Sequence, residues 1–294
     1  MWSYEHRIGS HVGLAWNGEV YFRQYFGTQR AARPHAHPVA VAGGPDLTCF
    51  APHDHAWHTG FWFNWKYING VNYWENTENG TPEGAIRMVG TECLTASADT
   101  VAAACDYVYD HPRDGEVAHE RREITWHRPS TDGSHALDYE VRLTANAVAV
   151  ALDRTPVTPQ TPWGGYGGLS WRFSRGLGVA SGLDAEGRRG TAIEHQSAPW
   201  ATLFGRVDGG PGLAAGVAMF DHPGNPRHPT PWRFIAEPGF AYLNPSPLLH
   251  GALEVAAGAS VRLRYRVLVY PGAGDAGRLN AEYEAFAASQ RPCG

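Results

Sequence analysis

Histidines are concentrated in one short stretch of this chain. Five of its 15 histidines lie between residues 35 and 58, namely His35, His37, His53, His55 and His58. Imidazole titrates near neutral pH, so it suits proton transfer. His35 and His37 are two residues apart, as are His53 and His55, so each pair would share one face of a strand. We predict that this segment forms the polar site, with His53, His55 and His58 as general acids or bases and His37 as a substrate ligand.

The same side chains are also candidate metal ligands, because imidazole is the commonest metal ligand in proteins. His35, His37, His53 and His55 would be the ligands. Their spacing matches no specific metal-binding signature, so a bound divalent metal is left open and no cofactor is assigned. The alternative is that these histidines are hydrogen-bonded fillers between loops. Five of them in so short a span favour a functional site.

Aromatic and amide side chains follow directly, in the stretch TGFWFNWKYINGVNYWEN at residues 59–76. Aromatic faces stack on the C–H faces of sugars, and planar amides bind pairs of hydroxyl groups. We therefore expect Trp62 and Asn64 to bind substrate. The stretch also reads as a core hairpin with a turn at Asn69-Gly70. Both interpretations hold together if half of the aromatic rings face the core and half face a cleft.

A proline-rich segment near the other end of the chain is a second candidate. Residues 222–232, HPGNPRHPTPW, contain four prolines, which fix an extended loop that cannot be a central strand. We predict that this loop converges with the histidine segment in one pocket. There His228 would be catalytic, and Asn225, Arg227 and Trp232 would bind substrate. The alternative is that the segment is a proline-rich surface loop with no part in a site.

Two further polar residues complete the predicted site. Arg172 follows the glycine-rich run at 164–168, which no helical pattern follows, so the run is not a nucleotide-binding loop. Arg172 or Arg227 would stabilise a developing oxyanion. Asn244, at the end of the segment 222–244, is expected to bind substrate.

The elements that must position these residues read as strands. Residues 137–143 and 261–269 alternate apolar and polar side chains, as a strand with one buried face does, and turn signals separate shorter candidates. Helical spacing is convincing only near the end, within 275–290. We predict an all-β fold in which two antiparallel sheets pack face to face, as a single domain over residues 1–294, with a short C-terminal helix.

Composition narrows the function. Charged residues make up 18% of the chain and the net charge is −5, which gives no basic surface for nucleic acid or an anionic membrane. No apolar run approaches the length of about 18 residues that a membrane helix needs, and no signal peptide is apparent. The four cysteines are widely spaced and form no CxxC pair, so we expect them to be free and reduced. These features lead us to expect a cytoplasmic protein.

The chain also lacks a GxSxG elbow, a Walker A motif, an HExxH pair and a Rossmann fingerprint.

Several motifs together resemble one bacterial family. RPHAHP, PHDHAWHTGFWF, INGVNYWEN, FDHPGNPRHPTPW, FAYLNP and RLRYRVLVYPG occur in the order found in the family labelled PmoA-like. The label is that of a membrane-integral methane monooxygenase subunit, whereas this chain has no membrane segment. The resemblance implies a fold similar to the galactose-mutarotase-like supersandwich, and a glycoside or oxidised sugar as substrate. The family pattern is kept here at His37, His53, His55, His58, Asn225, Arg227, His228 and Trp232.

Three functions remain in competition. The first is a carbohydrate-active lyase, hydrolase or epimerase that uses histidine acid–base chemistry, with or without a metal. The second is an oxidoreductase with a histidine-ligated mononuclear metal. The third is a non-catalytic sugar-binding module, which would not need so many histidines. In each sugar-directed case the partner is a small sugar or glycoside, and a homo-oligomer is left open.

Overall fold

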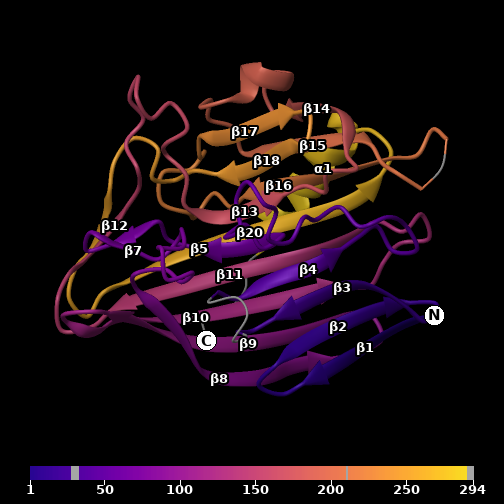
Figure 1. The fold of residues 1–294 in the computed structure, drawn as a ribbon. Coiled ribbons are helices and arrows are strands. Elements are labelled where there is room, and N and C mark those ends of the chain that lie inside the picture. Colours follow the sequence, from indigo (N-terminus) through magenta and orange to yellow (C-terminus); the bar gives the residue numbers. More distant parts are fainter. Residues whose placement is uncertain (28–32, 210, 290–294) are drawn as a thin grey trace.

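The computed structural model describes residues 1–27, 33–209 and 211–289. Within these residues the strands form three antiparallel sheets, two large and one small (Figure 1). The first large sheet has the order β1 (Trp2–Arg7), β2 (His11–Trp16), β3 (Glu19–Tyr25), β4 (His35–Val39), β5 (Phe61–Asn64), β13 (Gly168–Arg172), β18 (Phe240–Pro245), β17 (Trp232–Glu237).

The second large sheet has the order β14 (Gly178–Asp184), β15 (Trp200–Arg206), β16 (Ala214–Asp221), β20 (Ser260–Pro271), β11 (His135–Ala145), β10 (Gly115–His127), β9 (Thr100–His111), β8 (Ala85–Ala96). The small sheet consists of β19 (Leu253–Val255), β12 (Val150–Asp153), β6 (Tyr67–Ile68) and β7 (Val71–Asn72). A single 3₁₀ turn, η1 (Gly190–Ile193), precedes β15 in the described chain. The predicted all-β sandwich is confirmed.

The two large sheets share one core, built from the buried side of each alternating strand. Phe61 of β5 lies against Tyr139 of β11, with ring centroids 5.7 Å apart, and Phe22 of β3 lies against Trp126 of β10 at 6.0 Å. On the other face of the second sheet, the polar residues of the alternation pair across strands. Asp138 of β11, for example, accepts two hydrogen bonds from Arg266 of β20.

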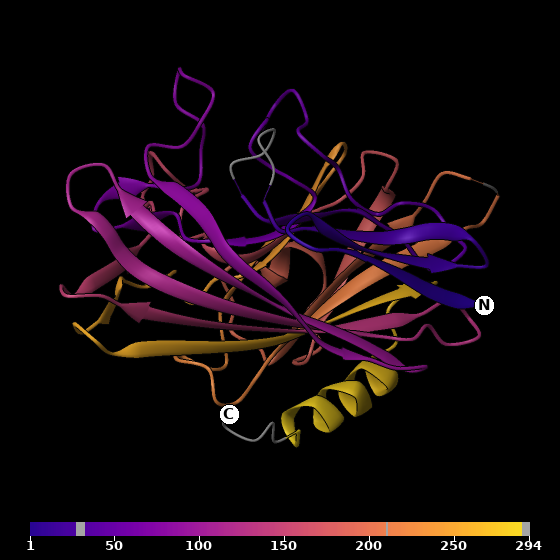
Figure 2. The same ribbon diagram turned by 90° about the horizontal axis from the view of Figure 1, so that it is seen from below.

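The predicted C-terminal helix is also confirmed, as α1 (Ala276–Ala287). The residue before it, Asp275, caps the first turn, because its carboxylate accepts a hydrogen bond from the backbone N–H of Arg278 at 2.7 Å. Leu279 and Phe286 pack on the outer face of the second sheet, in one buried group with Phe220. Figure 2 shows the helix, in yellow, on the outside of the strands.

Alternation in the first sheet sorts its side chains into a core face and an open face. In β5, Phe61 and Phe63 point into the shared core, whereas Trp62 belongs to a separate apolar group on the opposite face. In β18 the same alternation buries Leu243 in the core and leaves Tyr242 on the opposite face. This second face carries the pocket described below.

Two smaller expectations can be compared with the structure. Cys49, Cys93 and Cys105 are free, and Cys293 lies outside the described residues. No helix in the described part of the chain is long and apolar enough to cross a membrane.

Candidate active site

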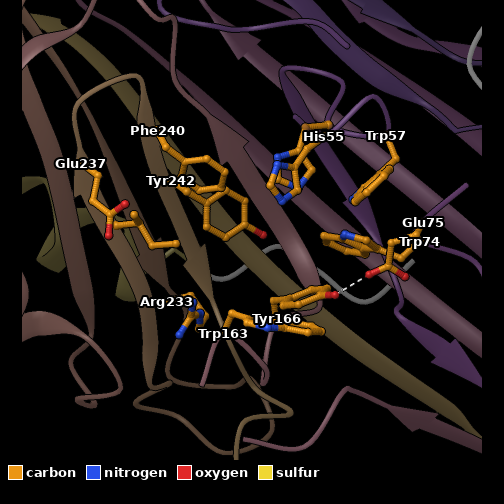
Figure 3. Close-up of a pocket in the computed structure, with 12 residues that line it drawn as sticks. His55, Trp57, Trp74, Glu75, Trp163, Tyr166, Arg233, Glu237, Phe240 and Tyr242 are labelled. Carbon is orange, nitrogen blue, oxygen red and sulfur yellow. Dashed lines mark hydrogen bonds between the residues drawn. The ribbon is translucent and has the colours of Figure 1, made fainter. Parts of the chain in front are cut away.

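A pocket of about 550 Å³ lies on the open face of the first sheet (Figure 3). Its walls come from segments far apart in the sequence: the loop before β5, the turn after β7, the loop before β13, and the paired strands β17 and β18. The lining residues are His55, Trp57, His58, Trp74, Glu75, Trp163, Tyr166, Arg233, Ile235, Glu237, Phe240 and Tyr242. A volume of this size and an aromatic lining are typical of small-molecule sites.

A carboxylate holds His55 in the pocket wall. Nδ1 of His55 lies 2.9 Å from Oδ2 of Asp54, and Nη2 of Arg172 donates to the same oxygen at 2.8 Å. Arg175 donates to the other oxygen of Asp54. Burial alone would raise the pKa of Asp54, but the hydrogen bonds from His55 and Arg172 hold it well below its usual range. The carboxylate is therefore ionised at neutral pH and fixes the proton of His55 on Nδ1. In the neutral ring Nε2 is then free to accept a proton.

His58 lies beneath His55, with the two rings stacked at a centroid distance of 4.6 Å. Burial lowers the pKa of His58 well below its ordinary value, and the nearby His55 and Arg172 lower it further. Nη1 of Arg172 is 3.5 Å from Nδ1 of His58. Because a guanidinium only donates, Nδ1 is the acceptor and the proton of the neutral ring sits on Nε2. His58 is thus a neutral hydrogen-bond donor beside a histidine that can accept a proton.

Arg172 supports both histidines from behind the pocket. Its side chain is fully buried, and its guanidinium carbon lies 3.6 Å from the centroid of the Phe240 ring. Besides Asp54, Nη2 also donates to the backbone oxygen of Gly239. The arginine is therefore locked by stacking and hydrogen bonds and acts through Asp54 and His58.

Aromatic rings form much of the remaining wall. The ring centroids of Trp74 and Tyr166 are 5.2 Å apart, and those of Tyr166 and Trp163 are 6.2 Å apart. Trp163 is 50% exposed, so the row continues to the rim of the pocket. Trp62 lies behind, 5.6 Å from Trp74 and 5.1 Å from His58. Flat apolar faces of this kind match the C–H faces of a pyranose ring.

A second carboxylate belongs to the pocket. The hydroxyl of Tyr166 donates to Oε1 of Glu75 at 2.5 Å, as the dashed line in Figure 3 marks, and the buried Lys66 forms an ion pair with Oε2. Lys66 is the only lysine in the chain. Burial lowers the pKa of Lys66 to about 8. The oxygens of Glu75 can accept hydrogen bonds from hydroxyl groups of a ligand.

Sequence comparison places the chain in a family. A family model matches residues 11–284, nearly the whole chain. The chain belongs to this family of unknown function, DUF6807. The matching family model does not carry the PmoA-like name, so that part of the resemblance stays a prediction. None of the curated proteins matches the sequence.

Several solved structures are similar to this DUF6807 member at low identity. A variant of a glycoside hydrolase family 97 enzyme from Pseudoalteromonas matches at 7% identity and a TM-score of 0.44, over 88% of this chain and 35% of that one. This chain thus spans about a third of that hydrolase. A putative aldose 1-epimerase from Klebsiella pneumoniae matches at 9% and 0.41, over 94% and 80%. A galactose mutarotase-like protein from Lactobacillus casei matches at 10% and 0.41, over 92% and 100%.

The predicted catalytic residues are only partly brought together. His55 and His58 line the pocket, and Arg172 lies behind them. His53 is exposed and lies outside the pocket lining, although it is two residues from His55. The predicted sharing of a strand face does not hold there, because residues 51–58 form turns and not a strand. The catalytic role of each residue stays a prediction.

The proline-rich loop does not reach the pocket, so the expected convergence is wrong. Nδ1 of His228 lies 2.9 Å from the buried carboxylate of Asp221, and the amide of Asn225 donates to the same side chain. Arg227 donates to the backbone oxygens of residues 247, 251 and 252. Trp232 faces the core and donates to the backbone oxygen of Ala198. Asn225 also bonds the backbone of Arg264 in β20, and the hydroxyl of Tyr283 in α1 lies 3.4 Å from Nε2 of His228, so the loop is held against these two elements. The strand that follows the loop supplies Arg233 to the pocket.

The remaining predicted substrate ligands pack beneath or beside the pocket. Trp62 and Asn244 are 1% and 0% exposed, and Asn64 is 0% exposed. The amide of Asn244 donates to the backbone oxygens of Gly167 and Leu169, and that of Asn64 donates to the backbone oxygen of Tyr73. Their hydrogen bonds hold the loops that carry Tyr166 and Trp74. As the structure stands, these residues position the walls and do not line the cavity.

Three of the four candidate metal ligands, His35, His37 and His55, have other partners. Nδ1 of His35 bonds the backbone oxygen of Arg33 at 3.0 Å, and Nδ1 of His37 bonds the hydroxyl of Thr48 at 2.8 Å. Burial lowers the pKa of His35 to about 4. Among the described residues, no three side chains of His, Cys, Asp or Glu are grouped so that they could hold a metal ion. The described residues therefore offer no preformed three-ligand centre.

Most of the far wall was not foreseen from the sequence. Arg233, Ile235 and Glu237 alternate along β17, and Phe240 and Tyr242 alternate along β18. The sequence signal for this wall is that apolar core residues alternate with other side chains in residues 232–245. It points polar and aromatic residues to the face opposite Trp232, Phe234 and Leu243.

Proposed function

We propose that this protein is a carbohydrate-active enzyme, a lyase, hydrolase or epimerase, that acts on a glycoside or oxidised sugar by histidine acid–base chemistry. The observation that carries the proposal is the Asp54–His55 pair, with its 2.9 Å contact, at the wall of an aromatic pocket of about 550 Å³. A binding module has no use for a carboxylate-oriented imidazole. An enzyme needs that arrangement to fix which ring nitrogen exchanges the proton.

The two histidines have complementary roles in this proposal. His55 accepts a proton at Nε2 from a carbon or hydroxyl of the substrate, and the ionised Asp54 stabilises the imidazolium that forms. His58, neutral because of burial, donates a hydrogen bond from Nε2 to the oxygen on which negative charge develops. The aromatic row of Trp74, Tyr166 and Trp163 supports the sugar ring, and Glu75 accepts hydrogen bonds from its hydroxyl groups.

The experiment is a turnover screen with a matched variant. Wild type, His55→Gln and His119→Gln are assayed on a panel of glycosides, uronides and free sugars, and folding is checked by circular dichroism. His119 lies on β10 of the second sheet and its side chain is 54% exposed, so it controls for the loss of a histidine as such. We expect wild type and His119→Gln to turn over the same substrate. His55→Gln should be slower by the factor of about 10²–10⁴ that a lost acid or base costs.

The same screen separates the competing functions. A chelator arm tests the metal oxidoreductase, because loss of activity that returns with added ion would place a metal in the reaction. Binding of a sugar without turnover of any panel member would favour the binding module. Turnover that persists in His55→Gln would contradict the proposal.

A further inference from the structure

Arg233 presents an unused hydrogen-bonding edge in the pocket wall. Arg233 is 4% exposed and lies in β17, on the face that carries the pocket. Nη1 is fully engaged: it donates to Glu194, to Nε2 of His195 at 2.8 Å, and to the backbone oxygen of Pro162 at 3.4 Å. Nε is buried without a partner, and among the described residues no acceptor for a hydrogen bond from Nη2 is found. The Nε and Nη2 donors share one side of the planar guanidinium.

The surroundings keep this edge in place. Oε2 of Glu194 accepts from the backbone N–H of Phe234, while Oε1 accepts from Arg233, so the carboxylate ties the guanidinium to its own strand. Burial lowers the pKa of His195, which keeps the ring neutral and lets Nε2 accept from Nη1. Glu194 balances the charge of Arg233 when the pocket is empty. The buried arginine is thus stable without a ligand, yet one edge stays unsatisfied.

Elsewhere in this chain the same edge binds carboxylates. Nε and Nη2 of Arg262 donate to Glu140 at 2.6 and 2.8 Å, and those of Arg266 donate to Asp138 at 2.6 and 3.0 Å. Arg87 uses the same pair of donors on Asp110. The parallel donors match the two oxygens of a carboxylate, whereas a single hydroxyl group satisfies only one of them.

The position of Arg233 sets where such a ligand would lie. In Figure 3, Arg233 and His55 are on opposite sides of Tyr242. Glu237 is four residues further along β17 on the same face, about 13 Å away at 3.3 Å per residue. Its negative charge disfavours an anion at that end of the strand. A ligand with one carboxylate would therefore place that group at Arg233 and its sugar ring against the aromatic row.

We propose that Nε and Nη2 of Arg233 bind the carboxylate of an acidic sugar, so that the substrate class of this pocket is a uronic or aldonic acid or its glycoside. This inference rests on the proposed function, since it concerns the same pocket. It makes Arg233 a specificity-determining residue that contacts the substrate away from the reacting atoms.

The test measures affinity for matched pairs of ligands that differ only in the carboxylate. Methyl glucuronide and methyl glucoside form one pair, and the galacto- and manno-configured compounds form two more. Binding is measured by calorimetry at neutral pH. We expect at least one acidic ligand to bind tighter than its neutral counterpart by about tenfold or more, as charge-assisted hydrogen bonds do. Arg233→Gln should abolish that preference, and Arg233→Lys should retain part of it.

Controls guard against simple loss of folding. Arg233→Gln leaves Glu194 without its partner, so the double variant Arg233→Gln/Glu194→Gln, which removes both charges, is measured beside it. Arg262→Gln, on the second sheet and outside the pocket lining, should keep the preference. The inference is overturned if no acidic ligand binds better than its neutral counterpart, or if the double variant weakens both members of a pair equally. Turnover of neutral glycosides that depends on His55 would then leave the proposed function standing without the anion site.

Discussion

Nδ1 of His55 lies 2.9 Å from Oδ2 of Asp54, and the same oxygen accepts a hydrogen bond from the fully buried Arg172. This relationship joins the loop before β5 to the end of β13, two segments more than a hundred residues apart. It fixes the orientation of one imidazole and the charge of one carboxylate at once. The acid–base chemistry proposed above depends on that geometry.

The buried histidine below this pair gives a first prediction. In His58→Phe the aromatic packing against Trp62 and Tyr242 is retained, but the Nε2 donor is lost. We expect turnover to fall about 10²-fold or more, because an oriented donor to a developing oxyanion is lost. The fold should survive, as judged by circular dichroism and melting temperature. A variant that melts like wild type and turns over substrate at the wild-type rate would remove His58 from the mechanism.

The rim of the pocket gives a second prediction. Trp163→Ala removes a half-exposed ring that stacks on Tyr166, so KM for a glycoside should rise several-fold while kcat changes little. Tyr4→Ala is the control, since Tyr4 is 43% exposed on β1 and lies outside the pocket lining. Steady-state kinetics on both variants decide the matter. Equal KM values in the two variants would show that Trp163 does not hold substrate.

The proline-rich loop gives a third prediction, on stability. Arg227→Ala removes hydrogen bonds to the backbone oxygens of Pro247, Gly251 and Ala252. We expect the free energy of unfolding to fall by about 1–2 kcal/mol, measured by denaturant titration. Turnover per folded molecule should stay near that of wild type. Loss of turnover with unchanged stability would instead return Arg227 to the substrate site.

Acid stability gives a fourth prediction. Burial lowers the pKa of His135 from 6.5 to about 4, and the ring bonds the backbone oxygen of Ala40 at 2.8 Å. Between these two pH values the unfolded chain binds a proton that the folded chain does not. Stability therefore falls as the pH is lowered from 6.5 toward 4, by about 1.4 kcal/mol per pH unit for this one proton.

The matched variant for that prediction is His135→Gln, which does not titrate in this range and can still donate to Ala40. Unfolding titrations at several pH values between 4 and 6.5 give the slope of the unfolding free energy against pH. This slope should be smaller in His135→Gln than in wild type, by the amount that corresponds to about one proton. A slope identical to that of wild type would show that His135 is not the group responsible.

Local patterns in the sequence predicted most of the fold. The alternation at 137–143 and 261–269 reflects one buried and one solvated face, and the structure pairs these residues in β11 and β20. The spacing of Leu279 and Phe286 reflects the side of α1 that packs on the second sheet. Such periodicity is a local consequence of burial, so it can be read without knowing the partner strands.

The site was harder to predict because its walls are set by strand pairing. His55 and His58 stood out by residue type, whereas Arg233 and Tyr242 look like ordinary members of alternating strands until β17 and β18 are placed beside β13 and β5. His228 and Asn225 were equally conspicuous by type. Both side chains form hydrogen bonds with the buried carboxylate of Asp221, and these bonds fix the conformation of the loop. Residue type alone does not distinguish a ligand-binding group from one that satisfies a buried charge.

The most direct test of the central claim is a double-mutant cycle on turnover with wild type, His55→Gln, Asp54→Asn and the double variant. If Asp54 acts by orienting His55 and stabilising its imidazolium form, His55→Gln lowers kcat by about 10²–10⁴-fold, and Asp54→Asn lowers it less. The double variant is then no slower than His55→Gln, because groups that act as a unit are not additive. Wild-type kcat in a folded His55→Gln variant, or effects that simply multiply in the double variant, would contradict the account.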